Sequence, residues 1–317
     1  MSSLSSSPGT SGKATAVPGN DELTIWGQTL IAEKWRNHIS HLPKRPELIE
    51  QLLPYNSLMM VAGQFQVGKT SELLHLMHCF AYGSTWHGLQ VEPAVAFYLT
   101  WEGTPKNLGS RIEKIAAQYE HLPMCYPWYI RMEPRKIHFN TAEGRARLAT
   151  LMRDLNPKPT VLLIDPFKRT VAGNYSLPEV ADGWIIGADT ICHELDCAII
   201  ISAHTNKIIY RKDNPPDELD ASRVKGAGDL LDGVSASLLI AEEKGYKSIK
   251  RPDGYYKTTW TSFGHVIKVL KARDATSEFP LLRVQLNRDL LRFWGEKWVI
   301  VDNQIGKMAE EPGQSGK

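Results

Sequence analysis

Several features are scarce in this sequence, and each absence argues against a class of protein. The 317 residues contain no apolar run approaching the roughly 20 residues that span a bilayer, and the N-terminus lacks the apolar stretch of a secretion signal. The few cysteines form no C-x-x-C pair, which argues against a disulfide framework; they are Cys79, Cys125, Cys192 and Cys197. The sequence therefore predicts a cytoplasmic protein with reduced thiols and no membrane partner.

Excess charge of one sign is also lacking. The 37 basic side chains nearly balance the 35 acidic ones, which leaves a formal net charge of +2. Bulk charge thus gives no indication of nucleic-acid binding, and any such site must come from local clusters of basic residues. We find no internal repeat, and the length allows one large domain or two smaller ones.

The most informative stretch is GQFQVGKT at residues 63–70. It fits the pattern G-x-x-x-x-G-K-[ST], and it lies between a short apolar run at 58–62 and a predicted helix at 71–82. In that setting backbone N–H groups surround phosphate oxygens at a helix N-terminus, Lys69 reaches the β- and γ-phosphates, and the Thr70 hydroxyl binds Mg²⁺. The chain is therefore predicted to bind a nucleoside triphosphate. The predicted binding residues are Gly63, Gln64, Phe65, Gln66, Val67, Gly68, Lys69, Thr70 and Ser71.

The remaining sequence predicts one catalytic domain between two polar tails. Residues 1–20 have almost no large apolar side chain and are expected to be disordered, as is the polar segment 303–317. Residues 21–47 predict an amphipathic helix and linker; the helix packs either on its own domain or on a neighbouring subunit. Strands and helices alternate through about residue 204, which predicts a parallel α/β sheet. Strand patterns at 235–241, 256–261, 266–270, 281–286 and 291–294 predict an antiparallel extension of a single domain at 48–302.

Two acidic residues follow apolar strands. Asp165 closes the run at 161–164, where an acid is expected to hold the Mg²⁺ shell beside Thr70. Pro166 follows it, so a general base must come from elsewhere. Glu102 follows the predicted strand at 95–100, at the sheet edge where open α/β folds bind ligands, and it is the candidate to deprotonate the attacking water. A solvated glutamate that opens a loop is the alternative.

The order of these motifs resembles the RecA-like ATPases, in particular the branch of RepA-type and DnaB-type hexameric helicases. The resemblance covers about residues 48–296 as a pattern of motifs. It implies ATP and Mg²⁺ as ligands, a RecA-like core and assembly into a ring, a hexamer by analogy. It also implies that His204, which ends the strand after Asp165, senses the γ-phosphate.

A basic pair near the C-terminus looks like the family's K-x-R hairpin. In that hairpin the cations insert into the next subunit's nucleotide site, and the matching residues here are Lys271 and Arg273. Residues two positions apart on a strand point to the same face, so both cations would reach the developing γ-phosphoryl charge together. Lys225 is the second candidate for this role, because RepA-like proteins carry a basic residue before the glycine that corresponds to Gly226. Solvated charges on a strand edge are the alternative.

Two polar loops at 167–178 and 205–225 leave the same sheet edge. Their basic residues suit contact with the phosphate backbone of single-stranded DNA. Acidic residues offset the positive charge of the second loop, so a loop that is merely solvated is the alternative. The candidate DNA-binding residues are Lys168, Arg169, Lys207, Arg211, Lys212, Arg223 and Lys225.

The resemblance implies an ATP-driven motor on single-stranded DNA, a replicative helicase of the plasmid or phage RepA type that relies on a loader or primase supplied by other proteins. A filament-forming recombinase and an ATP-gated regulatory assembly stay open, because they share the same nucleotide motifs. We expect no metal beyond nucleotide-bound Mg²⁺. The metal-type side chains at 192–197 lack zinc-site spacing, and His75 and His78 are expected to pack or to face solvent.

Overall fold

The computed structural model describes residues 46–205, 224, 227–250 and 255–309. By its contacts the chain divides into Met1–Pro46 and Glu47–Lys317, and the fold below is that of the second unit. The predicted tail at 1–20 and the predicted helix within 21–47 lie outside the described residues. Among the described helices, none has the length and apolar character that crossing a bilayer requires.

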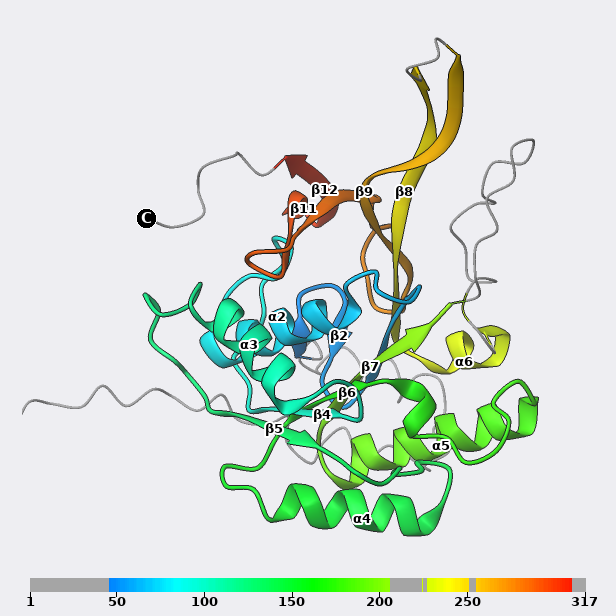
Figure 1. The fold of residues 1–317 in the computed structure, drawn as a ribbon. Coiled ribbons are helices and arrows are strands. Elements are labelled where there is room, and N and C mark those ends of the chain that lie inside the picture. The colour runs from blue at the N-terminus through cyan, green and yellow to red at the C-terminus, as the bar shows by residue number, and fades with distance from the viewer. Residues whose placement is uncertain (1–45, 206–223, 225–226, 251–254, 310–317) are drawn as a thin grey trace, which may run out of the picture. The chain divides into compact units, whose positions relative to one another are not determined.

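Six parallel strands form the centre of the fold, in the order β8-β3-β7-β6-β4-β5 (Figure 1). They are β3 (Leu58–Gly63), β4 (Ala96–Thr100), β5 (Trp128–Met132), β6 (Val161–Asp165), β7 (Ala198–His204) and β8 (Ala236–Lys250). Strands β3, β4 and β6 are buried along their whole length, as expected where helices cover both faces of a parallel sheet. The carboxyl ends of β3, β4, β6 and β7 therefore meet at one edge.

Helices form a layer on each face of this sheet (Figure 1). One face packs against α2 (Lys69–Tyr82) and α3 (Pro105–Ala116), and the other against α4 (Ala142–Arg153), α5 (Pro178–Glu194), α6 (Ala227–Gly233) and the short 3₁₀ turn η1 (Phe167–Arg169). Side chains alternate along a strand, so Met59 and Val61 join the core with α2 while Met60 and Ala62 join the opposite core. As predicted, Thr141 caps α4, its hydroxyl accepting from the Gly144 N–H.

An antiparallel extension continues the sheet beyond β8. It consists of β9 (Tyr256–Ala272), β10 (Leu282–Asn287), β11 (Arg292–Val301) and β12 (Gln304–Ala309), each antiparallel to its neighbour. A separate small sheet joins β1 (Glu47–Ile49) to β2 (Leu53–Pro54). The predicted α/β class with a parallel core and an antiparallel extension is confirmed. The sequence predicted two strands, at 256–261 and 266–270, where the structure has the single strand β9. This strand runs through Gly264 and forms a long ribbon with β8 (Figure 1).

The predicted polar tail at 303–317 is wrong over its first residues. Gln304–Ala309 forms β12, which pairs with β11 from Val301↔Gln304 to Glu296↔Ala309. The turn between them uses Asp302 and Asn303, both with positive φ, and Asp and Asn tolerate this conformation better than most residues. The Asp-Asn pair was therefore a turn signal in the sequence, and the prediction of a tail from polar composition overlooked it.

Candidate nucleotide-binding site

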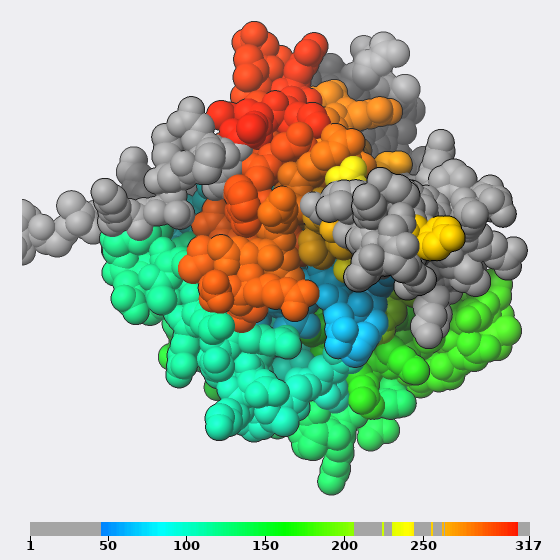
Figure 2. All heavy atoms as spheres, turned by 45° about the horizontal axis from the view of Figure 1, so that its top comes forward, coloured from blue at the N-terminus to red at the C-terminus, as the bar shows by residue number. Residues whose placement is uncertain are grey.

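The predicted phosphate loop leaves β3 at the carboxyl edge of the sheet and enters α2. It requires glycine at two positions. A Cβ on Gly63 would lie 2.7 Å from both the Ile240 carbonyl oxygen and Val67 Cγ1, and Gly68 has φ 105° with Phe293 Cζ 2.8 Å from the place of a Cβ. Phe65 in the loop is 76% exposed. In Figure 2 the blue segment that contains the loop reaches the surface beside the orange C-terminal strands.

The Lys69 side chain is held by hydrogen bonds inside the predicted phosphate loop. Its Nζ donates to the carbonyl oxygens of Gly63 at 2.9 Å and Gln64 at 2.7 Å. Burial lowers its pKa to about 8, although the negative charges of Asp165 and Glu102 oppose that shift. The Lys69 amine is therefore mostly protonated near pH 7, and two backbone carbonyl groups orient it inside the loop.

Asp165 lies at the centre of the site and accepts hydrogen bonds on both carboxylate oxygens. The Thr70 hydroxyl donates to Oδ2 at 2.6 Å, the Tyr98 hydroxyl to the same oxygen at 2.9 Å, and the Ser202 hydroxyl to Oδ1. Asp165 is 2% exposed, so these donors offset the cost of burying its charge. The structure thus brings together Thr70 and Asp165, an oxygen pair of the kind that Mg²⁺ prefers.

Sequence reasoning missed Tyr98 and Ser202. Both lie within apolar runs, where a single hydroxyl looks like part of a core strand. The register pairs Ile164 of β6 with Ile201 of β7, which puts Ser202 beside Asp165. The available signal was a polar side chain near the carboxyl end of a buried strand next to the strand that carries the acid.

Glu102 lies just beyond the end of β4 and is solvent-exposed. Its N–H donates to the Thr100 hydroxyl at 3.2 Å, which in turn donates to the Asp165 carbonyl oxygen at 3.1 Å. Partial desolvation raises the pKa of Glu102, and the charge of Asp165 adds to the shift while Lys69 and Arg169 oppose it. A carboxyl whose pKa is raised at this edge suits a group that must accept a proton.

His204 lies beside Lys69 at the end of β7. Its Nδ1 is 3.5 Å from Lys69 Nζ, because the parallel register of β3 and β7 pairs Gly63 with His204. The residue predicted to sense the γ-phosphate therefore adjoins the lysine predicted to bind it.

The structure does not place Lys271 and Arg273 at the phosphate loop of their own chain. Lys271 Nζ donates to the carbonyl oxygens of Leu231 at 2.8 Å and Asp232 at 2.7 Å, and Arg273 donates to Asp232 O at 3.1 Å. Both cations thus satisfy carbonyl groups at the C-terminal end of α6, where positive charge is favourable. Sequence reasoning missed this local role.

The two predicted DNA loops are described to different extents. Lys168 and Arg169 are exposed on η1, just after Asp165. The candidates in the second loop lie outside the described residues; they are Lys207, Arg211, Lys212, Arg223 and Lys225.

Comparisons with known proteins agree with this geometry. A family model described as an AAA domain matches residues 29–208, more than half of the chain. A search of curated protein sequences finds no match. Among solved structures, the chain is similar to a DnaB-like replicative helicase studied with primase, at 12% identity and a TM-score of 0.54, with 86% of this chain and 69% of that one covered. It is equally similar to a second solved structure, described as an ATPase domain, at 12% identity and a TM-score of 0.54, with 88% and 99% covered.

Identities this low show a shared fold, and the family match carries the assignment. The extent of that match, together with the fold and the phosphate-loop geometry, shows that the chain belongs to the AAA domain family and has a RecA-like P-loop ATPase fold.

Proposed function

We propose that this protein hydrolyses ATP at the Lys69–Thr70–Asp165 site and uses the reaction to move along single-stranded DNA, as a ring-shaped replicative helicase of the plasmid or phage RepA type. The observation that carries the proposal is the partly buried Thr70–Asp165 hydrogen bond beside a partly desolvated lysine. It lies at the carboxyl edge of a sheet whose fold matches that of a DnaB-like helicase.

The chain's own residues divide the work of hydrolysis. Backbone N–H groups of the loop and Lys69 would bind the phosphates, and Thr70 with Asp165 would hold Mg²⁺. An ion bound there would supply neutralisation of phosphate charge and polarisation of the phosphoryl oxygens. Glu102 accepts the proton of the attacking water, and Lys271 or Arg273 of a neighbouring subunit, or else Lys225, stabilises the transition state.

His204 offers a physical link between nucleotide and DNA. Its ring adjoins Lys69, and its backbone leads into the second basic loop. A change in the γ-phosphate site would therefore move the start of that loop. A recombinase or a regulatory ATPase would use the same nucleotide chemistry. The effect of DNA on hydrolysis, and the effect of the protein on duplex DNA, therefore distinguish these two alternatives from a helicase. We place this activity in the cytoplasm, with loading or priming supplied by other proteins.

The test is steady-state ATP hydrolysis with and without single-stranded DNA, measured across protein concentration and salt, with Lys69→Ala as the inactive control. Strong DNA stimulation with a concentration-dependent onset, followed by duplex unwinding, supports the proposal. Stimulation with filaments and no unwinding would indicate a recombinase instead. Hydrolysis that DNA does not change would refute the helicase and leave a regulatory ATPase.

A further inference from the structure

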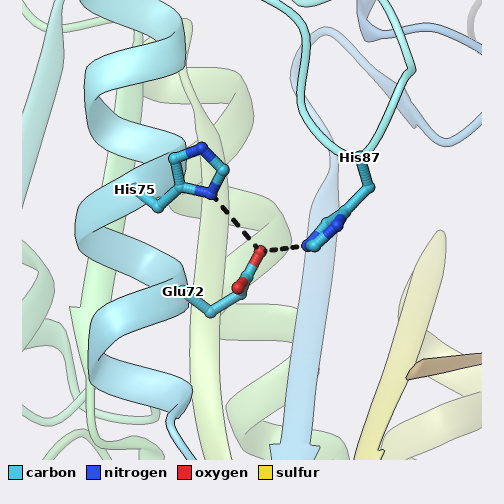
Figure 3. A group of neighbouring side chains, drawn as sticks. All are labelled: Glu72, His75 and His87. Atoms are coloured by element: carbon cyan, nitrogen blue, oxygen red, sulfur yellow. Dashed lines mark hydrogen bonds and ion pairs between the residues drawn. The ribbon is translucent and has the colours of Figure 1, made fainter. Parts of the chain in front are cut away.

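Three metal-ligating side chains converge on the side of α2 that faces the turn at residues 83–89 (Figure 3). Glu72 and His75 are three residues apart on α2 and share one face of the helix, and His87 reaches them from the turn. Glu72 Oε1 lies 2.7 Å from His87 Nε2 and 3.9 Å from His75 Nδ1. One donor atom from each residue lies within 4.8 Å of the others.

Two atoms of this cluster are buried without a hydrogen-bond partner. Glu72 is 1% exposed and His75 is 2% exposed, and neither Glu72 Oε2 nor His75 Nδ1 has a partner. The other carboxylate oxygen accepts from Trp86 Nε1 as well as facing His87. Orphaned buried polar atoms are uncommon and call for an explanation, of which a bound ion is one.

We infer that Glu72, His75 and His87 form a binding site for a divalent transition metal ion, with Zn²⁺ the best match. Two imidazole nitrogens and one carboxylate oxygen are a recurring zinc ligand set, whereas Mg²⁺ and Ca²⁺ prefer oxygen ligands throughout. Small side-chain shifts would bring the three donor atoms to zinc-binding distance.

The position of the cluster gives the ion a structural role. Glu72 follows Thr70 by two residues, and its N–H donates to the Gly68 carbonyl oxygen at 3.0 Å in the first turn of α2. The His87 carbonyl oxygen accepts from the Trp298 N–H of β11 at 2.8 Å. An ion held by this cluster would therefore cross-link the start of the phosphate-loop helix to the turn that contacts β11. This role is separate from the Mg²⁺ site and goes beyond the proposed function.

The first test is calorimetric titration of Zn²⁺ into tag-free protein that has been stripped with chelator. Excess Mg²⁺ is present to occupy oxygen-only sites, and nucleotide is omitted. We expect one Zn²⁺ per chain, with affinity lowered at least about tenfold in Glu72→Gln and in His87→Gln. His193→Gln is the matched control, because His193 is exposed on α5 and remote from the cluster in sequence; it should bind as the wild type does. Absence of stoichiometric uptake, or unchanged affinity in both cluster variants, would overturn the inference.

A second measurement keeps the test decisive if the variants fail to fold. X-ray absorption at the zinc edge of the loaded wild-type protein should show only nitrogen and oxygen ligands, with the multiple scattering of imidazole. A sulfur ligand or a hydrated ion would contradict the assigned ligand set. Zinc should also raise the thermal midpoint, since a ligand that binds only the folded state stabilises it by mass action. None of these measurements depends on ATP hydrolysis, so their outcome is independent of the proposed function.

Discussion

Replacing Tyr98 by phenylalanine would remove one oxygen from the centre of the nucleotide site and keep the shape of the buried ring. The Tyr98 hydroxyl donates to Asp165 Oδ2 at 2.9 Å, and Tyr98 is fully buried. Burial and the adjacent Asp165 charge raise the pKa of Tyr98 well above its usual value, so the phenol remains a donor across the ordinary pH range.

The expected loss of stability depends on which hydrogen bonds to Asp165 remain after the substitution. A hydrogen bond to a charged group contributes about 1.5–3 kcal/mol to stability. Phenylalanine leaves no orphaned donor, and Asp165 keeps its bonds from Thr70 and Ser202. The cost should therefore lie in the lower part of that range. Asp165 and Thr70 keep their contact, so nucleotide binding should survive.

Urea unfolding of the nucleotide-free protein at pH 7 would measure this loss. The midpoint should fall while the dependence of the unfolding free energy on urea stays the same. The matched control is Tyr129→Phe, which deletes a hydroxyl from a partly exposed residue of β5 on the opposite face of the sheet. That change should cost less than about 0.5 kcal/mol. Equal midpoints for the two variants would refute the view that Tyr98 stabilises the Asp165 carboxylate.

Further predictions concern the chemistry of the site. Because burial lowers the pKa of Lys69 to about 8 and phosphates favour the charged amine, nucleotide binding should take up a proton and weaken as the pH rises above 8 toward 10.5. Calorimetry in buffers with different ionisation enthalpies would detect this uptake, and a heat independent of buffer would count against it. Glu102→Gln should bind ATP normally but hydrolyse it at least about 10²-fold more slowly in single-turnover assays; near-normal turnover would remove Glu102 as the base. Lys271→Ala and Arg273→Ala should each lose ATPase activity and regain part of it when mixed with Glu102→Gln subunits, since a site that takes its base from the cation variant and its cation from the Glu102→Gln subunit has both groups intact. If they lose only the stability expected from weaker capping of α6, about 0.3–1 kcal/mol, both cations act within their own chain.

Features that depend on neighbouring residues could be predicted from the order of amino acids. The phosphate loop was visible because its glycines, lysine and threonine have fixed spacing and lie between an apolar strand and a helix. The parallel core followed from buried apolar runs alternating with helices, and Thr141 indicated the start of α4. These signals are local, because backbone conformation and capping are decided within a few residues. The catalytic assignments of Glu102 and His204 stay predictions.

Contacts between distant residues became visible only in the folded chain. Strand order and register bring Tyr98 and Ser202 to Asp165, and nothing in their own segments indicates that contact. Folding of the C-terminal strands places Lys271 and Arg273 at the end of α6, where carbonyl groups need donors. A turn after α2 brings His87 to Glu72 and His75, which their positions in the sequence gave no reason to join. Such contacts depend on the register and packing of the whole sheet, and that information is spread across the chain.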